Sequence, residues 1–407
     1  MTLAGIGGFM VVRGDTLPAV DSGIVFLYNK DYTRARAFFA QRIKNPAASI
    51  DDHRGFQDAC LKLDSGALRD SRRIYREMAE KNPQDPRILF LFGRCLPCEK
   101  GADYFTKVLT VDSCYPWALN ACGACYFEAG DYLRASQSFS RAIACNPNFI
   151  EAYQNLAQVS IAQKRYAAAK EIFRKLIKTH RNQAKPYEWL GDLYLTWGKD
   201  AYALLAYQRS AQLGTRGPGI FFKIGYASFK VKKCFEAVEA YKRSISQGNT
   251  TYEVYYNMGT ALEILDRPAE ALESYEIAYD KNNTPDLLYA MGNCAVLLAL
   301  YSKAIDSYRR YLEKNPRSTE ALFGLANAFQ MKKDYDSAVA TYRTILSIDP
   351  GFSKAYYNLG SIYAYHLKDP QQMVAYWKKF VALTNDRAEA AYIQKEIVRL
   401  RDTREAE

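Results

Sequence analysis

Hydrophobic residues recur with a helical period along most of the chain. Over residues 152–163 and 166–178 the apolar side chains fall at i, i+3, i+4 and i+7, which predicts two amphipathic helices. The polar turn Gln163-Lys164-Arg165 separates them. Second helices of this kind end near Asn-Pro, Asp-Pro or a Gly/Asn cluster, which stops a helix. Because the same two-helix pattern recurs along the chain, we expect an all-α protein.

Small residues recur at one position in the first helix of each predicted pair. From Gly123 onward these residues are 33 or 34 positions apart. This small column consists of Gly23, Ala59, Gly93, Gly123, Ala157, Gly191, Gly225, Gly259, Gly292, Ala326 and Gly360. Residues without a bulky side chain let two helix axes approach closely.

Aromatic residues form a second column, sixteen positions later in most repeats. Small residues precede these aromatic residues by four positions in every repeat but the last, which has Gln372. This wedge column consists of Phe39, Tyr75, Phe105, Phe139, Phe173, Tyr207, Tyr241, Tyr275, Tyr308, Tyr342 and Tyr376. We expect each ring to fill the space where the next helix pair docks. The wedge column also accounts for much of the high tyrosine content, 32 of 407 residues.

The two columns resemble the signature of the tetratricopeptide repeat family. Its large–Leu-Gly–Tyr, Ala, Phe, Ala, Pro pattern has a 34-residue period. First-helix matches stand at Tyr187…Leu190-Gly191…Tyr194 and at residues 356–363. The resemblance implies an α-solenoid of about eleven helix-turn-helix units in a right-handed superhelix. First helices would line its concave face and second helices its convex face.

Four segments are expected along the chain. Residues 1–15 form an irregular extension, residues 16–115 three degenerate repeats, residues 116–386 eight regular repeats, and residues 387–407 a capping helix and tail. In the third repeat only 12 positions separate Gly93 from Phe105, so about four residues are missing. Ile393, Ile397 and Leu400 share one helical face, which is typical of the helix that caps a solenoid.

Positive charge is concentrated in the middle of the chain. The net charge is +11, and residues 116–251 hold 19 basic and 9 acidic side chains. A basic patch centres on one second helix and consists of Arg165, Lys170, Arg174, Lys175, Lys178 and Arg181. This block favours an alternative function, electrostatic binding of nucleic acid or of an acidic partner. A solvated convex face would have the same composition, and no nucleic-acid-binding motif accompanies the patch, so nucleic acid is not the expected partner.

Nine cysteines are scattered along the chain. A disulfide-rich secreted domain would be shorter and denser in Cys, so we expect reduced thiols in the cytoplasm. Export is the alternative, because Met1–Val12 is apolar, although no basic residue precedes the apolar run. The pairs Cys95-x-x-Cys98 and Cys122-x-x-Cys125 have spacing close to that of a zinc site. Cys95, Cys122, Cys125 and Cys294 also occupy positions where other repeats have core residues, so we expect no metal.

Catalytic chemistry is not expected. The three histidines, His53, His180 and His366, belong to no HExxH motif, and GxSxG, GxGxxG and GxxxxGK[ST] are absent. Repeats take up residues 16–386, which leaves no room for a catalytic domain. We therefore predict a non-catalytic scaffold or adaptor that binds a protein and has no cofactor. Since no run of eighteen apolar residues occurs, no membrane span is expected.

A groove is predicted along the first helices of the C-terminal repeats. Three positions before the small column stand the residues of a groove stripe, which are Phe222, Tyr256, Tyr289, Phe323 and Tyr357. One position after the column stand the residues of a polar row, which are Tyr226, Thr260, Asn293, Asn327 and Ser361. Rings beside hydroxyls and amides suit a peptide with apolar anchors. The alternative is that the rings pack between neighbouring first helices.

Three asparagines two positions before the column have counterparts in the family that bind peptide backbone. They are Asn155, Asn257 and Asn358, and an amide offers both a donor and an acceptor. A solvated polar position is the alternative for each. The family's carboxylate clamp for chaperone tails is not expected, because Trp189 and Asn120 stand where it requires Arg and Lys. Sequence does not identify the partner or the oligomeric state.

Overall fold

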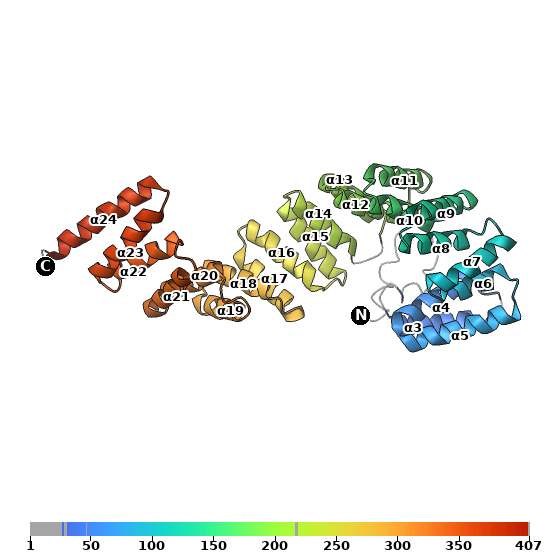
Figure 1. Ribbon diagram of the computed structural model, residues 1–407, viewed down its shortest axis with the longest axis horizontal. Coiled ribbons are helices and arrows are strands. Elements are labelled where there is room, and N and C mark those ends of the chain that lie inside the picture. The colour runs from blue at the N-terminus through green and yellow to red at the C-terminus, as the bar shows by residue number, and fades with distance from the viewer. Residues whose placement is uncertain (1–26, 28–30, 46, 216–218, 406–407) are drawn as a thin grey trace, which may run out of the picture. The chain divides into compact units, whose positions relative to one another are not determined.

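The computed structural model describes residues 27, 31–45, 47–215 and 219–405, with side chains as far as residue 400. All regular secondary structure in these residues is helical (Figure 1). Contacts divide the chain into an N-terminal unit, Met1–Trp197, and a C-terminal unit, Gly198–Glu407. The expected extension at residues 1–15 and Gly23 of the small column lie outside the described residues.

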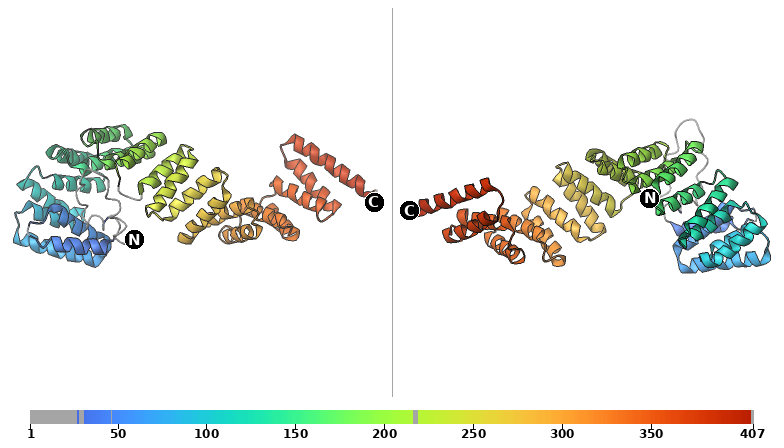
Figure 2. Two further views of the ribbon diagram at one scale, coloured as in Figure 1. Left: turned by 180° about the vertical axis from the view of Figure 1, so that it is seen from behind. Right: turned by 45° about the horizontal axis from the view of Figure 1, so that its top comes forward.

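The N-terminal unit is a row of antiparallel helices (Figures 1 and 2). Its helices are α3 (Tyr32–Arg42), α4 (Ile50–Leu63), α5 (Ser65–Lys81), α6 (Pro86–Arg94), α7 (Cys98–Val111), α8 (Pro116–Glu128), α9 (Tyr132–Cys145), α10 (Ile150–Ala162), α11 (Tyr166–Thr179) and α12 (Ala184–Thr196).

The C-terminal unit continues the same alternation of first and second helices. Its helices are α13 (Asp200–Gln212), α14 (Gly219–Lys230), α15 (Cys234–Ser246), α16 (Tyr252–Ile264), α17 (Pro268–Lys281), α18 (Pro285–Leu297), α19 (Tyr301–Lys314), α20 (Thr319–Met331), α21 (Tyr335–Ile348), α22 (Ser353–Tyr365), α23 (Pro370–Leu383) and α24 (Arg387–Glu405).

Local sequence explains where many helices begin and end. Asp85 caps α6 through its carboxylate, and Pro86 occupies the first helical position, where its missing N–H is not needed. Ser49 and Asp52 form a reciprocal capping box at the start of α4. From α8 onward the turn between two helices of a repeat uses one residue with positive φ, such as Ala299 at 58° or Lys333 at 65°.

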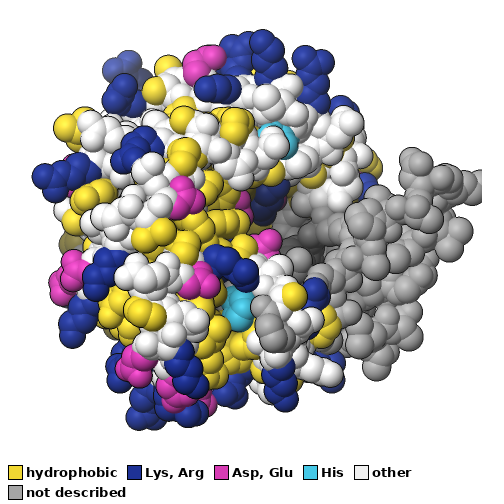
Figure 3. All heavy atoms as spheres, turned by 90° about the vertical axis from the view of Figure 1, so that its right-hand side faces the viewer, with side chains coloured by type: hydrophobic (Ala, Val, Ile, Leu, Met, Phe, Trp, Pro, Cys, Tyr) yellow, Lys and Arg dark blue, Asp and Glu magenta, His cyan; other side chains and the backbone are white. Residues whose placement is uncertain are grey.

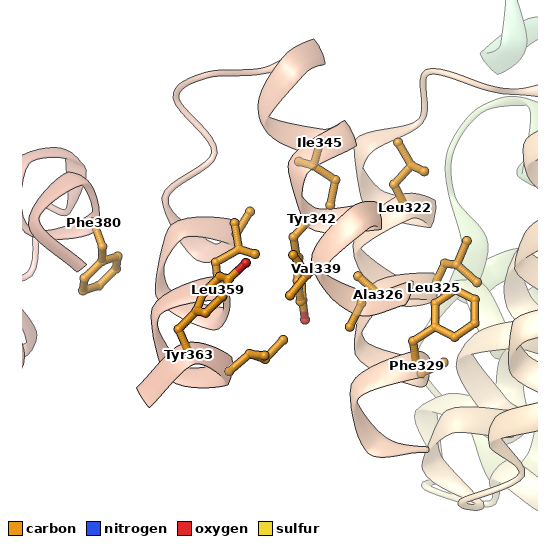
Figure 4. Packing of buried hydrophobic residues seen from close by; sticks show 14 of the residues in the cluster. Leu322, Leu325, Ala326, Phe329, Val339, Tyr342, Ile345, Leu359, Tyr363 and Phe380 are labelled. Atoms are coloured by element: carbon orange, nitrogen blue, oxygen red, sulfur yellow. The ribbon is translucent and has the colours of Figure 1, made fainter. Parts of the chain in front are cut away.

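The small and wedge columns meet inside the repeats of Gly93, Gly123, Gly225, Gly259 and Gly292. A Cβ added to Gly259 of α16 would lie 2.6 Å from the ring of Tyr275 on α17, so the ring occupies the place of a side chain. The Tyr308 ring also lies against Gly324 of the next repeat. Figure 4 shows Tyr342 between Ala326 of α20 and Leu359 of α22. The rings therefore join each repeat to the following one, and a repeat cannot bury its apolar face alone.

First helices form the more closely packed layer of each unit. Besides its own partner, α6 contacts α4 and α8 in the N-terminal unit. In the C-terminal unit α14 contacts α16, and α18 contacts α20. Among the described helices, no two successive second helices approach one another to the same extent. First helices therefore form the inner layer, where a groove is expected.

One wedge position differs from the prediction in the last repeat. Gly360 of α22 packs against Trp377, which is 1% exposed, whereas Tyr376 is half-buried. The turn before α23 holds one additional residue, because its positive-φ residue Lys368 follows Gly360 by eight positions instead of seven. That insertion moves the inward face of α23 by one residue. Met373, not Gln372, is the buried residue four positions earlier.

Both ends of the regular repeats show adaptations. At the C-terminal side, Ile393 and Ile397 of α24 are buried in the cluster that includes Trp377 and Phe380, as expected for a capping helix. At the N-terminal side, α6 has 9 residues where α8 and α10 have 13. The missing residues are the final turn of α6, as the spacing from Gly93 to Phe105 predicts.

Candidate functional site

The groove stripe lies on the first helices of the C-terminal unit, one residue on each of α14, α16, α18, α20 and α22. Tyr256 is 39% exposed, and the other four rings are half-buried. In the N-terminal unit the corresponding residues Phe56 and Phe90 are buried at 2% exposure. The two units therefore differ, and only the C-terminal unit presents aromatic surface at this position.

Each stripe ring packs against an aromatic residue of the second helix. Ring centroids are 6.0 Å apart for Phe222 and Tyr241, 6.1 Å for Tyr256 and Tyr275, and 6.0 Å for Tyr289 and Tyr308. Phe323 and Tyr342 are also 6.0 Å apart, and Tyr357 lies 5.3 Å from Phe380. These contacts are with second helices, not between neighbouring first helices, and each covers one face of a stripe ring. The rest of each ring is partly exposed.

Polar-row residues accept hydrogen bonds from the wedge tyrosines. The Tyr308 hydroxyl donates to Asn293 Oδ1 at 2.7 Å, and the Tyr342 hydroxyl donates to Asn327 Oδ1 at 2.5 Å. Asn358 Nδ2 donates to the Tyr342 hydroxyl at 2.8 Å and to Asn327 Oδ1 at 3.2 Å. These bonds join the second helix to two successive first helices and fix the orientation of the amides.

The orientation leaves donors on the side chains of the polar row. Since the Oδ1 atoms of Asn293 and Asn327 are used, their Nδ2 groups remain without a protein partner among the described residues. They are not among the buried unsatisfied atoms, so they are open to solvent or a ligand. In α22 the Ser361 hydroxyl instead donates to the Tyr357 carbonyl at 2.9 Å.

Two further polar residues of the network stand four positions after the small column. Glu263 accepts from the Tyr275 hydroxyl, which also lies 3.3 Å from Thr260 Oγ1. Gln330 Oε1 lies 3.0 Å from the Tyr342 hydroxyl. Sequence analysis did not identify them. A polar residue stands at this position in two of the three repeats whose wedge tyrosine bonds to the polar row, and the repeat of Tyr308 has Val296 there, so the sequence signal was weak.

Tyr241 differs from the other wedge tyrosines. Its hydroxyl is buried and has no hydrogen-bond partner in the structure. The residue of the polar row in this repeat is Tyr226, which is 38% exposed and offers no carboxylate or amide. Burial raises the pKa of Tyr241, and of Tyr308 and Tyr342, far above the usual value, so all three phenols stay protonated. Those of Tyr308 and Tyr342 act as donors.

The two remaining candidate asparagines lie in different surroundings. Asn155 belongs to α10 of the N-terminal unit, where its Nδ2 donates to Asn120 Oδ1 of α8 at 2.9 Å. That bond occupies Asn155 in a contact between successive first helices. Asn257 lies on α16, half-buried, beside Tyr256 of the stripe. Asn257 is thus in the C-terminal unit with Asn293, Asn327 and Asn358.

The basic patch is distributed along the outer face of α11. Arg165, Arg174, Lys175, Lys178 and Arg181 are exposed, and Lys170 is half-buried. Glu171 pairs with Lys170 at 3.4 Å and with Arg174 at 3.3 Å. Lys175 and Lys178 have no ion-pair partner in the described part of the chain. Whether the patch binds anything remains a prediction.

Cysteine pairing corrects the expectation of nine reduced thiols. Cys98 is bonded to Cys125, with Cα atoms 5.3 Å apart, and Cys114 to Cys145, with Cα atoms 5.5 Å apart. Cys125 is therefore not a free core residue, because the short turn after α6 places Cys98, the first residue of α7, beside it. Five other cysteines, among them Cys95, Cys122 and Cys294, are buried and free, as expected.

Metal ligands do not gather in the residues that the structure describes. The two Cys-x-x-Cys pairs form no set of four thiolates, since one member of each is in the Cys98–Cys125 disulfide. No group of three or more Cys, His, Asp or Glu with suitable geometry is found there. Burial raises the pKa of the Cys122 thiol to about 11, so that thiol stays protonated.

The arrangement combines partly exposed rings with amide donors in fixed orientation. These groups suit an extended chain of carbonyls and apolar side chains. No helix among the described residues has the length and apolar character needed to cross a membrane.

Comparison with known proteins agrees with the fold. Tetratricopeptide repeat family models match residues 102–188, 289–353 and 353–387. Comparison with curated protein sequences finds no significant match.

Three solved structures illustrate the structural similarity. YrrB, described as a TPR protein with an unusual peptide-binding site, is 20% identical over 46% of this chain and 96% of its own, with a TM-score of 0.43. The C-terminal part of a TPR protein from Cytophaga hutchinsonii is 19% identical over 59% of this chain and 98% of its own, with a TM-score of 0.49. Cut9–Hcn1 of the APC/C is 13% identical over 92% of this chain and 95% of its own, with a TM-score of 0.36.

These scores are too low to say what this chain binds. The 34-residue spacing, the packing of small and wedge columns and the three family matches agree with one another, and they show that the chain belongs to the tetratricopeptide repeat family.

Proposed function

We propose that the chain is a non-catalytic scaffold that binds a peptide or helical segment of a protein partner along the first helices of its C-terminal unit. The observation that carries this proposal is the combination of exposed rings and free amide donors on one helix layer. Tyr226 and Tyr256 are 38% and 39% exposed, and the Nδ2 groups of Asn293 and Asn327 have no protein partner among the described residues.

The two kinds of group have separate roles in this proposal. Tyr226 and Tyr256 provide apolar contact area for side chains of the ligand. Asn293 and Asn327 donate to its backbone carbonyls, and hydrogen bonds from Tyr308 and Tyr342 hold the two amides in position before the ligand arrives. Because the amides are already ordered, binding does not have to order them, which favours affinity.

Selection from a phage-displayed library of random peptides against the purified full chain would supply a defined ligand. We expect the double variant Tyr226→Ser, Tyr256→Ser to bind a selected peptide at least tenfold more weakly. A matched control is Phe235→Ser with Tyr392→Ser, two rings that are 60% and 56% exposed on α15 and α24. Equal affinity of both variants for every selected peptide would refute the proposal.

The donor role can be tested separately from the rings. In the variants Asn293→Asp and Asn327→Asp, the new carboxylate still accepts from the tyrosine hydroxyl but has no N–H to offer a carbonyl. We expect weaker peptide binding and unchanged thermal stability. Unchanged peptide affinity in the double variant would show that these amides do not contact the ligand.

The disulfides bear on where the chain works. Two disulfides in one domain are typical of proteins from oxidising compartments. We therefore propose the exported alternative in place of the cytoplasm. Mass spectrometry after alkylation of the protein in its source cells tests this, because an exported chain retains both bonds and a cytoplasmic chain is alkylated at Cys98, Cys114, Cys125 and Cys145.

A further inference from the structure

The short third repeat opens a cleft on the opposite side of the N-terminal unit from the inner helix layer. The cleft has a volume of about 690 Å³ and lies between the second helices α5 and α7. Its floor is α6 and the turn that follows, represented by Leu89, Phe92, Leu96 and Pro97. Because α6 lacks its final turn, the connection to α7 is short and forms part of this floor. The volume is within the range of ordinary ligand pockets.

The floor of the cleft is apolar and rigid. Leu89 and Phe92 are 5% and 6% exposed, so they are fixed by the core beneath them. The Tyr104 ring of α7 stands edge-on to Phe92, with centroids 4.9 Å apart. Pro97 precedes Cys98, whose disulfide with Cys125 fixes the start of α7. Leu96 and Tyr104 are half-buried and Pro97 is exposed, so an apolar side chain of a ligand would find contact area on these three residues without rearrangement.

The rim of the cleft is mostly positive. Arg72 and Arg76 of α5 face Lys100 and Lys107 of α7 across it. The Arg72 guanidinium is fixed by a hydrogen bond from its Nε to the Cys95 carbonyl at 3.1 Å. Lys107 lies over the Tyr104 ring, 5.1 Å from its centroid.

None of these four cations has an ion-pair partner in the described part of the chain. Arg72 contacts a carbonyl and Lys107 a ring, whereas Arg76 and Lys100 have neither kind of contact there. On α5 the carboxylate of Glu77 instead pairs with Arg73 at 3.6 Å, outside the cleft lining. The lining also includes Glu80 and Asp103, and neither pairs with a rim cation within the described part. Four cations against two carboxylates give the rim a net positive charge.

We propose that this cleft is a second docking site, which binds an acidic peptide segment with one or two apolar anchor residues. The apolar floor would hold the anchors, and the unpaired Arg76 and Lys100 would bind flanking Asp or Glu side chains. Nucleic acid fits less well, because Glu80 and Asp103 would repel a continuous phosphate backbone. Figure 3 shows the side on which α5, α6 and α7 lie in Figure 1, where hydrophobic side chains gather in the middle of the face with Lys, Arg, Asp and Glu around them.

Fluorescence anisotropy of the full chain tests the proposal with defined probes. The panel consists of fluorescein-labelled octapeptides in which two residues chosen from Phe, Leu and Tyr are flanked by Asp and Glu. A second panel replaces each acidic residue with Lys. We expect acidic members to bind and their affinity to fall with added salt. The variant Arg76→Glu, Lys100→Glu should bind about tenfold or more weakly, since each reversal turns an attraction into a repulsion.

The matched control is Lys378→Glu with Lys379→Glu on α23, two exposed lysines, which changes the net charge of the chain equally. We expect this control to bind the acidic peptides as the unmodified chain does. Equal loss in the cleft and α23 variants would overturn the proposal, as would no preference for acidic over basic peptides. Displacement of the peptide by a short single-stranded RNA at lower concentration than by unlabelled peptide would also overturn it.

Discussion

Three wedge tyrosines occupy near-identical sites, so the contribution of a single hydroxyl to the free energy of unfolding can be compared among them. Tyr342 makes contacts of 2.5, 3.0 and 2.8 Å with three amide side chains, Tyr308 makes one of 2.7 Å, and the buried Tyr241 hydroxyl makes none. All three residues are at most 2% exposed. Substitution by Phe removes the hydroxyl and keeps the ring that packs against the small column.

The expected changes differ in sign. Loss of a hydrogen bond costs about 0.5–1.5 kcal/mol, and a buried polar group without a partner costs about 1–3 kcal/mol. Tyr342→Phe should therefore lower the free energy of unfolding by about 1–2 kcal/mol, because its half-buried amide partners can regain water. Tyr308→Phe should lower it by about 1 kcal/mol. Tyr241→Phe should raise it by about 1 kcal/mol, since no bond is lost and an unsatisfied group is removed.

Repeat proteins can unfold in parts, so the assay must have local resolution. Amide hydrogen exchange of the full chain, followed by mass spectrometry, reports the opening free energy of α14–α15, α18–α19 and α20–α21 separately. Thermal unfolding gives an independent value, with a shift of roughly 2–4 °C per kcal/mol for a unit of this size. If all three variants destabilise their repeats equally, or if Tyr241→Phe is the most damaging, the account of the phenol–amide network is wrong.

Four further predictions follow from other features. Burial raises the pKa of the wedge tyrosines, so above about pH 10 the folded chain keeps protons that the unfolded chain loses. The free energy of unfolding should therefore fall as pH rises above about 10. Phenolate absorbance should appear together with the loss of helical circular dichroism. Burial, and then the charge of Arg87, lowers the pKa of His53, so the urea midpoint of the N-terminal unit should fall as pH drops below about 6.5, and His53→Gln should remove that fall. Ala299→Gly should raise the melting temperature by relieving about 1 kcal/mol of left-handed strain at φ 58°, and an unchanged or lower value would contradict the turn geometry. Replacing both Cys98 and Cys125 by Ser should lower the free energy of unfolding by about 3–4 kcal/mol, measured by urea denaturation of the N-terminal unit. A reducing agent should destabilise the parent chain but should not cause the same additional loss of stability in the variant.

The repeat could be predicted from sequence because one packing contact recurs in every unit. Gly259 must be small since Tyr275 occupies the place of its side chain, and the same requirement fixes both columns at a constant spacing. The predicted wedge position was wrong in the last repeat, where the spacing between the small residue and the aromatic residue changes. One additional residue in the last turn moved the wedge from Tyr376 to Trp377, and aromatic residues at both positions hid the shift.

Features that depend on distances between repeats were harder to predict. Cys98 and Cys125 are 27 residues apart, and their pairing results from the missing turn of α6, which moves the start of α7 beside α8. The sequence showed that the residues of the polar row are polar, but it did not predict their hydrogen bonds with Tyr308 and Tyr342. These bonds come from second helices, whereas the polar row was identified from first-helix positions alone. The extent to which the stripe is exposed likewise depends on side-chain packing.

The overlapping disulfides have a mechanical consequence. Cys114 lies between Cys98 and Cys125, and Cys125 lies between Cys114 and Cys145, so the two loops closed by the disulfides overlap along the sequence. Under tension along the backbone, the shortest covalent path from residue 98 to residue 145 runs through both bridges and only residues 114–125. Roughly 110 Å of contour length is therefore withheld from extension while the bonds last. A load applied across the chain would extend the C-terminal repeats and leave α7–α9 as a block of limited length.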